Sequence, residues 1–333
     1  MILSIWHVAI ILCYNTDTLR IEGNAMKKGM IGGQAVLEGV MMKAPKKLAM
    51  AVRKEDKSIE VWEQPYVSWK KRAKIYDWPI IRGVVTFLES LVVGVKVLMQ
   101  SARMYDEEAA ESYGPSKFDK KVAEKTGSAA ENVAIFFSLL LSLVLAVGLF
   151  TVIPAVTTSF LRGVIHSNVL LSLIEGVIRL LIFFGYIISI SFLKDIRRVF
   201  QYHGAEHKTI NCYESEKELN VENAQTFTTL NPRCGTAFLL VVMVVSILVF
   251  SLLGWNNIVL RILFKIMLLP VVAGLSFELI RWAGRTESGV AKVLIWPGMM
   301  LQKLTTKEPD DEQVEVAIRA FLLAQDGGLD EEA

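Results

Sequence analysis

Two histidines flank a glutamate in the stretch His203-Gly204-Ala205-Glu206-His207, and these residue types at this spacing could bind and use a metal ion. The histidines are four residues apart, so on a helix their imidazoles project from one face, about one turn apart. The Glu206 carboxylate could then accept a proton from a metal-bound water, as in the inverted zincin pattern H-x-x-E-H. Zinc lowers the pKa of such a water toward about 7. The sequence therefore predicts a divalent metal site, with Zn²⁺ as the expected ion, two histidine ligands and Glu206 as general base.

A metal site needs at least one more protein ligand. Two candidates are Glu278, in the segment SFELIR, and Cys234, in the segment NPRCGT. Glu278 could instead pair with Arg281, one helical turn further on, and Cys234 could be a small buried residue at a turn. The histidines themselves could form a polar patch that binds lipid phosphate. Weaker candidates for the same site are Cys212 and Arg233.

The composition shows what kind of molecule must position these side chains. Apolar residues make up 53% of the 333 residues, charged residues make up 21%, and the mean hydropathy is +0.41. No charged residue occurs between Asn132 and Ile153 or between Thr236 and Leu260. Such runs can cross a hydrocarbon layer about 30 Å thick, which takes about 20 helical residues. The sequence therefore predicts an integral membrane protein in contact with membrane lipid.

Charge and cysteine content exclude two other classes of protein. The formal net charge is +2, and the chain has no Lys/Arg block of the size that nucleic-acid-binding proteins carry. We therefore expect no nucleic-acid partner. Three cysteines are too few for a secreted scaffold built on disulfides.

The expected fold class is an α-helical polytopic membrane protein, with about four transmembrane helices in a core of residues 131–282. The expected spans are 132–153, 169–193, 236–254 and 258–280. Pro154 is expected to end the first span. Basic residues are concentrated in the 194–235 connection and in both terminal regions. Because cytoplasmic loops are enriched in Lys and Arg, this predicts a multi-pass protein of the inner (plasma) membrane with the histidine-bearing loop and both termini in the cytoplasm.

The regions outside the core are more polar. Residues 26–78 contain short runs of β-branched residues between turn residues, which predicts a small β-rich cytoplasmic segment. Residues 79–104 are apolar except for four charges spaced every seven residues, which favours an amphipathic interfacial helix over a fifth span. A linker, 105–130, follows, and the C-terminal region 283–333 is expected to be cytoplasmic. Residues 1–25 are interpreted as an upstream extension of the working protein, the alternative being a short membrane anchor.

A second polar pair, Glu175 and Arg179, lies inside the second expected span. The two residues are four apart on one helix, and ionisable groups in spans usually face the bundle interior. The pair could mark a substrate path, but the simpler expectation is that the two charges neutralise each other.

Several stretches resemble the YqhQ-like family, a bacterial membrane-protein family of unknown function (domain of unknown function 1385). They are GGQAVLEGVMM at 32–42, YHGAEHK at 202–208, NPRCGT at 231–236 and TTKEPDD at 305–311. The resemblance covers about residues 27–324, which supports discounting residues 1–25. It implies a metal-dependent enzyme with no established substrate. It also makes Gln34 and Glu38 candidates for lining the same cytoplasmic cleft.

Taken together, the residues and the resemblance predict a metal-dependent membrane enzyme, most simply a hydrolase of a membrane-associated substrate such as a peptide or a lipid headgroup. A non-catalytic membrane scaffold or regulator, with the polar N-terminal region as its binding module for an unknown protein partner, is the first alternative. A transporter is the second, supported only by Glu175 and Arg179 and lacking a visible inverted repeat.

Overall fold

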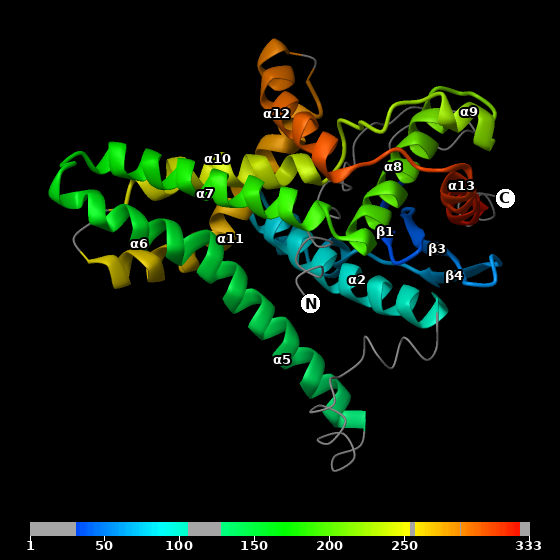
Figure 1. Cartoon of the computed structure of the whole chain (residues 1–333), viewed down its shortest axis with the longest axis horizontal. Helices are drawn as coiled ribbons and strands as arrows, with labels where there is room; N and C mark the ends of the chain where they lie inside the picture. The colour runs from blue at the N-terminus through cyan, green and yellow to red at the C-terminus, as the bar shows by residue number, and fades with distance from the viewer. Residues whose placement is uncertain (1–30, 106–127, 254–256, 287, 327–333) are drawn as a thin grey trace.

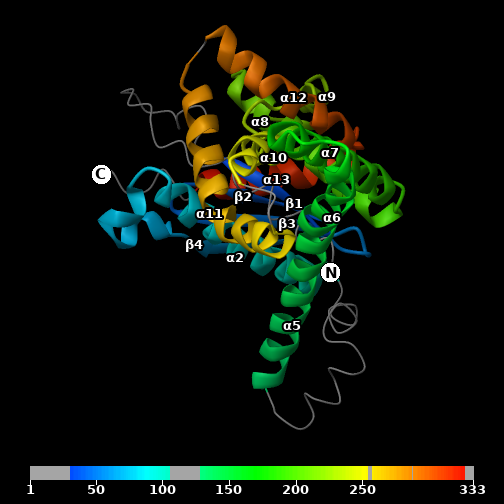
Figure 2. The ribbon, with the colours of Figure 1, turned by 90° about the vertical axis from the view of Figure 1, so that its left-hand side faces the viewer.

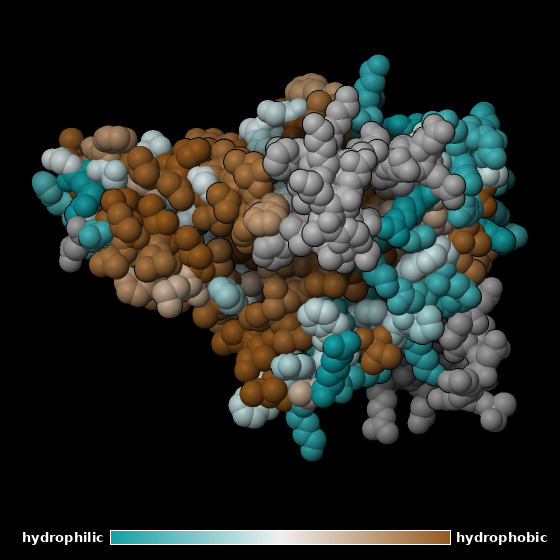
Figure 3. Space-filling view, turned by 90° about the horizontal axis from the view of Figure 1, so that it is seen from below, coloured by the Kyte–Doolittle hydropathy of each residue, from teal (hydrophilic) through white to brown (hydrophobic). Residues whose placement is uncertain are grey.

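A computed structural model describes residues 31–105, 128–253, 257–286 and 288–326. It has a polar end built around a β-sheet and an apolar end built from long helices (Figure 1). Seen from below, hydrophobic side chains cover the helical end and hydrophilic side chains cover the other (Figure 3). The expected N-terminal extension, residues 1–25, lies outside the described residues, as does most of the expected linker.

The sheet has four antiparallel strands in the order β1-β2-β3-β4. They are β1 (Gly32–Val36), β2 (Gly39–Lys43), β3 (Lys47–Arg53) and β4 (Ile59–Pro65). This confirms the expected small N-terminal antiparallel sheet. Gly39 begins β2 so close to β3 that a Cβ there would overlap the carbonyl oxygen of Ala51, so only glycine permits this pairing.

Helices cover both faces of the sheet. Because successive side chains of a strand point to opposite faces, Ala35 packs into one hydrophobic cluster and Val36 into another. The first cluster is closed by α8 and α13, and the second by α2. The bounds of these helices are α2 (Ile81–Tyr105), α8 (Lys194–Glu214) and α13 (Asp311–Asp326), with the short α9 (Val221–Gln225) beside α8 and α13.

Three helical segments are long and apolar enough to cross a membrane. They are Leu140–Gly163, Asn168–Ser191 (α7) and Ile258–Ala283 (α11). A further apolar helix, α10 (Thr236–Ser251), has 16 residues and is shorter than the other three. Full-length spans are therefore found for three of the four expected segments. α12 (Gly289–Thr305) packs against α10, with Gly298 directly on Ala237.

The first apolar segment runs on through Pro154, and the expectation that this proline ends the span is wrong. The segment consists of α5 (Ser128–Val147), a π-helical turn (Gly148–Val152), α6 (Ile153–Ser159) and a 3-10 turn (Phe160–Gly163). Proline has no N–H, so the carbonyl of Phe150 lacks its usual helical donor. Arg179 of α7 donates its Nε–H to that oxygen at 2.8 Å. In both views α5 extends away from the other helices (Figure 1, Figure 2).

α2 connects the apolar end to the sheet and is not among the described helices that meet the length and composition of a span. Its first turn packs closely on α11, because Gly83 lies against Gly274 and a Cβ on Gly274 would come 2.5 Å from Ile80. Arg82 donates two hydrogen bonds to the carboxylate of Glu278, at 2.6 and 2.5 Å. The second half of α2 lies under the sheet. The helix expected at the membrane interface therefore connects the apolar end of the molecule to the sheet.

Glu89→Ala is expected to loosen the chain just before α2. The buried Glu89 carboxylate accepts hydrogen bonds from the Ser68 hydroxyl at 2.9 Å and from the Trp69 N–H at 2.7 Å. Hydrogen bonds to a charged group contribute about 1.5–3 kcal/mol, so trypsin cleavage after the basic residues at 70–74 should accelerate about ten-fold. Glu63→Ala, which removes an exposed carboxylate, is the control. Equal cleavage rates in the two variants would contradict this role of Glu89.

Candidate metal centre

The histidine pair lies on α8, where every residue from Tyr202 to Ile210 is buried. This confirms that the two histidines share a helix. Gly204 makes room for the chain that follows α12, because a Cβ there would overlap the carbonyl oxygen of Lys307. The N–H of Lys307 donates to the Phe200 carbonyl at 2.9 Å. The glycine thus allows residues 305–307 to cross directly over the helix.

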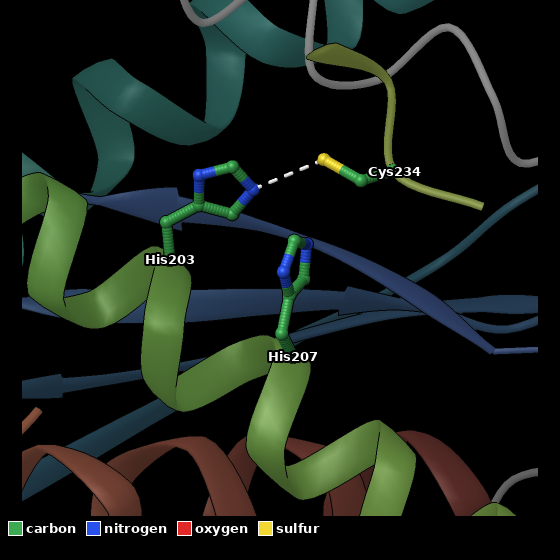
Figure 4. Close-up of side chains that lie close together, drawn as sticks. All are labelled: His203, His207 and Cys234. Atoms are coloured by element: carbon green, nitrogen blue, oxygen red, sulfur yellow. Dashed lines mark hydrogen bonds between the residues drawn. The ribbon is translucent and has the colours of Figure 1, made fainter. Parts of the chain in front are cut away.

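The two imidazoles are neighbours, with ring centres 4.4 Å apart (Figure 4). Nδ1 of His203 lies 2.9 Å from the carbonyl oxygen of Thr305, and Nδ1 of His207 lies 2.5 Å from that of Thr229. A carbonyl oxygen can only accept, so each Nδ1 carries the proton. Each Nε2 then has the lone pair with which a neutral imidazole binds metal. Burial, and secondly the neighbouring His203, hold the pKa of His207 well below its usual value, which keeps this ring neutral.

Cys234 provides a third donor atom, and its Sγ lies 3.2 Å from Nε2 of His203 (Figure 4). The cysteine is in the turn that precedes α10, where the N–H and the hydroxyl of Thr236 lie 3.5 and 3.3 Å from the sulfur. Gln302 of α12 holds this turn in place. Its side chain bonds both the N–H and the carbonyl of Asn231, at 2.9 and 2.7 Å. The thiol is therefore positioned by two helices other than α8.

The three side chains together can hold a metal ion. One donor atom from each of His203, His207 and Cys234 lies within 4.8 Å of the other two. In a tetrahedral site with metal–nitrogen bonds of about 2.0 Å and metal–sulfur bonds of about 2.3 Å, two nitrogens or a nitrogen and a sulfur are about 3.3–3.5 Å apart. The His203 and Cys234 donors are already 3.2 Å apart, so only the longer separations, which are at most 4.8 Å, must shorten by about 1 Å. Two imidazole nitrogens and one sulfur leave one tetrahedral position for a further ligand.

Glu206 is buried beside the histidines and contacts the sheet. Its carboxylate accepts a hydrogen bond from the N–H of Gly33 in β1, and a Cβ on Gly33 would come 2.8 Å from Cγ of Glu206. The other carboxylate oxygen, Oε2, has no hydrogen-bond partner among the described residues. Burial raises the pKa of Glu206 to about 8. Glu206 does not belong to the group of three donor residues. Because of its raised pKa, its carboxyl group can hold or release a proton near neutral pH.

The structure does not bring Glu278 to the histidines. Its carboxylate is engaged by Arg82 and lies 3.4 Å from the N–H of Ile80, which also donates to it. The direct partner is therefore on α2, and not Arg281 on the same helix. Of the two candidates for the third ligand, only Cys234 joins the histidine pair.

The two candidates from β1 and its turn lie near α8 but outside the donor group. Glu38, at a φ of 48° in the turn after β1, pairs with Arg198 and accepts a hydrogen bond from the Tyr202 hydroxyl at 3.3 Å. Gln34 is fully buried in β1, and neither atom of its amide has a hydrogen-bond partner among the described residues.

The two weaker ligand candidates, Cys212 and Arg233, interact with other groups. The Cys212 thiol donates to the carbonyl of Glu218 at 3.6 Å, in the turn after α8. Arg233 forms an ion pair with Glu214 at the end of α8. Neither side chain belongs to the group of three donors.

Sequence reasoning did not identify the residues that orient the imidazoles. The acceptors are main-chain carbonyls of Thr229 and Thr305, which no side-chain pattern reveals. One signal was present, because Gly204 interrupts a helical pattern between the two histidines, and an interior helical glycine usually has a packing reason. A second signal was the TTKEPDD stretch, which contains Thr305.

Comparisons with known proteins give a family but no activity. A family model described as a protein of unknown function, DUF1385, matches residues 78–326. The chain is also similar to the uncharacterized protein YqhQ of Bacillus subtilis (strain 168), with 36% identity over 296 residues, which cover 87% of this chain and 90% of that protein. No solved structure matches.

Proposed function

We propose that this chain, which belongs to the DUF1385 family, is a metal-dependent membrane enzyme with His203, His207 and Cys234 as ligands. The observation that carries the proposal is the pair of Nδ1–carbonyl hydrogen bonds. They direct two lone pairs toward the position of one buried thiol. Outer contacts of this kind orient imidazoles in metal sites. Sulfur and imidazole donors suit Zn²⁺ among the divalent ions.

The proposed reaction is hydrolysis, with Glu206 as the group that accepts and returns a proton. A zinc ion with one open position would supply a bound water of lowered pKa. Glu206 follows His203 by three residues on α8 and immediately precedes His207, and one of its oxygens is not committed to another described group. Its buried carboxyl group is therefore suited to exchange a proton, which typically contributes about 10²–10⁴-fold to a rate.

The position of the site supports a membrane-associated substrate. Cys234 lies two residues before α10, an apolar helix, and the Thr305 carbonyl ends α12, which packs on that helix. The histidines belong to the polar end of the molecule. A substrate at this boundary would have one part in lipid and one part in water, as a lipid headgroup or a membrane-bound peptide has. The basic loop residues favour the cytoplasmic side of a bacterial inner membrane for this end.

A non-catalytic scaffold is the second candidate, and burial of the donors favours it. His203 is fully buried, His207 is 1% exposed and Cys234 is 5% exposed. Closed sites of this kind are typical of structural metal ions, which hold a fold together without reacting. In that case the ion would join α8 to α10, and Glu206 would have no role in chemistry.

Metal analysis of the detergent-purified full chain tests the proposed site. We expect about one Zn²⁺ per chain in the wild type, none in His203→Ala/His207→Ala, and metal affinity at least about ten-fold weaker in Cys234→Ser. Cys212→Ser is the matched control, because Cys212 is also a buried cysteine but does not belong to the group of three donor residues. A wild type that holds no metal after incubation with Zn²⁺ would exclude the site.

Glu206→Gln separates the enzyme from the scaffold. We expect the variant to keep its metal but to lose about 10²–10⁴-fold of any metal-dependent ester or amide hydrolysis found in a screen of phospholipids and membrane peptides. The measurement is the hydrolysis rate per bound metal ion. Equal rates in Glu206→Gln and the wild type, or no metal-dependent hydrolysis in either protein, would leave the scaffold as the function.

A further inference from the structure

The chain between the sheet and α2 forms two short 3-10 turns, Trp69–Arg72 and Lys74–Asp77. They lie beside the C-terminal half of α11, where Figure 2 shows them in light blue. Asp77, the last residue of the second turn, is close enough to Arg281 for their charges to attract. Arg281 lies in the last turn of α11, which is long and apolar enough to cross a membrane. The two turns are therefore at the level where this span ends.

The backbone at Ile80 fixes these turns against α11. Its φ is 67°, a value that a β-branched residue rarely adopts, so neighbouring contacts must hold it. The residue packs on Gly274, where a Cβ would come 2.5 Å from the Ile80 side chain. Its N–H lies 3.4 Å from the carboxylate of Glu278, to which it donates. The chain before Ile80 is thus held at one height along α11.

Large side chains at this level face outward. Trp78 is 59% exposed and Trp282, in the last turn of α11, is 46% exposed. Ile75 and Tyr76, in the second turn, are exposed as well. Trp and Tyr are enriched where a membrane meets water, because one part of the ring is apolar and another is polar. This surface therefore suits the headgroup layer of a bilayer.

The same region carries an excess of positive charge. Residues 67–82 and 278–286 together contain seven Lys or Arg residues and two acidic residues, Asp77 and Glu278. Two more acidic residues are close. Glu89 accepts the N–H of the first residue of the first turn, and Glu287 is next in the sequence. Even with all four acidic residues counted, an excess of three positive charges remains.

Three of these cations are available to a bilayer. Lys71, Arg72 and Lys74 are exposed, and none of them forms an ion pair with a described residue. The guanidinium group of Arg72 lies over the ring of Trp69, 5.5 Å from its centre. Lys and Arg residues next to a membrane surface are attracted by anionic lipids, and each one adds to the binding.

We propose that residues 69–78 and the last turn of α11 form a binding surface for the headgroups of anionic phospholipids. The exposed rings enter the headgroup layer, and Lys71, Arg72 and Lys74 pair with the negative charge of the lipids. The occupant is the membrane in which α11 lies, because the surface continues directly from the end of that helix. The inference does not depend on a metal ion at the histidines.

Limited proteolysis of the full chain in nanodiscs locates the contact. Trypsin can cleave after the basic residues at 70–74, and after Lys57 in the turn between β3 and β4, which serves as the internal control. We expect cleavage at 70–74 to be about ten-fold slower when the bilayer contains phosphatidylglycerol than when it is phosphatidylcholine alone. Cleavage after Lys57 should be equal in the two bilayers. About 1 M salt should abolish the protection, because it screens charges beyond about 3 Å.

Native mass spectrometry of detergent-purified variants tests the three cations. Lys71→Gln/Arg72→Gln/Lys74→Gln should bind phosphatidylglycerol about ten-fold more weakly than the wild type, with phosphatidylcholine unchanged. The matched control is Lys57→Gln/Lys217→Gln/Arg319→Gln, which removes three exposed cations from the polar end and should bind both lipids as the wild type does.

Three results overturn the proposal. They are equal cleavage at 70–74 in the two bilayers, protection that persists at high salt, and equal loss of phosphatidylglycerol from the two triple variants. If the first triple variant does not fold, the proteolysis of the wild type decides.

Discussion

Gly204→Ala is expected to destabilise the protein and to weaken metal binding, although glycine provides no donor atom. An alanine Cβ would overlap the Lys307 carbonyl oxygen, which is backbone and cannot rotate away. Residues 305–307 must then move off α8, at a cost of about 2–3 kcal/mol. The Thr305 carbonyl that fixes the tautomer of His203 moves with them. Loss of such an outer contact typically weakens metal affinity about 10–100-fold.

Gly185→Ala is the matched control for this prediction. Gly185 is also inside a helix, α7, but a Cβ there meets no atom within 4 Å. Alanine is a better helix former than glycine by about 0.5–1 kcal/mol, so this variant should be unchanged or slightly more stable. Thermal unfolding in detergent and metal content per chain measure the two effects. Wild-type metal content in Gly204→Ala would show that the Thr305 carbonyl does not position His203.

Arg179→Leu is expected to have a still larger effect on stability, about 3–5 kcal/mol, because it removes three hydrogen bonds of a charged group, each of which contributes about 1.5–3 kcal/mol. The variant loses hydrogen bonds to the Phe150 carbonyl, the Ser246 hydroxyl and the Glu175 carboxylate at once. The helix does not replace the bond to the Phe150 carbonyl, because Pro154 cannot supply the usual N–H donor. A carbonyl left without a partner away from water costs about 1–3 kcal/mol by itself.

The control for Arg179→Leu is Arg197→Leu, at an exposed position of α8. Surface substitutions of this kind usually change stability by less than about 0.5 kcal/mol. Thermal unfolding of both variants in the same detergent is the measurement. A second comparison is Arg179→Leu combined with Pro154→Ala, which restores an N–H opposite Phe150. If the double variant is no more stable than Arg179→Leu, the unpaired carbonyl is not the main cause.

Local features of the fold could be predicted from the sequence, because they depend on neighbouring residues. The histidine pair at four-residue spacing was expected on a helix and lies on one. Short runs with β-branched residues between turn residues predicted the antiparallel sheet. Long uncharged runs predicted apolar helices. In each case the residue types within a short window carry the information.

Contacts between distant segments could not be predicted in the same way. Cys234 and Glu278 were both candidates for the third ligand from the sequence. Glu278 does not join the histidines because its carboxylate is bound by Arg82, which is 196 residues away in the chain. Lys265 was not considered a partner of Glu175, because the two lie 90 residues apart on different helices. Which side chains face each other across a packed interface depends on how each helix is rotated about its own axis. This rotation cannot be read from the pattern of a single sequence.

The crossing of residues 305–307 over α8 also sets an order of events during synthesis. His203 and the carbonyl that orients it are 102 residues apart. At about 5–20 residues per second, His203 leaves the ribosome about 5–20 seconds before its acceptor. During that interval the His203 imidazole lacks the carbonyl that fixes its tautomer. A chain that ends before Thr305 would therefore contain all three donors and the Thr229 acceptor of His207, but not the carbonyl that orients His203.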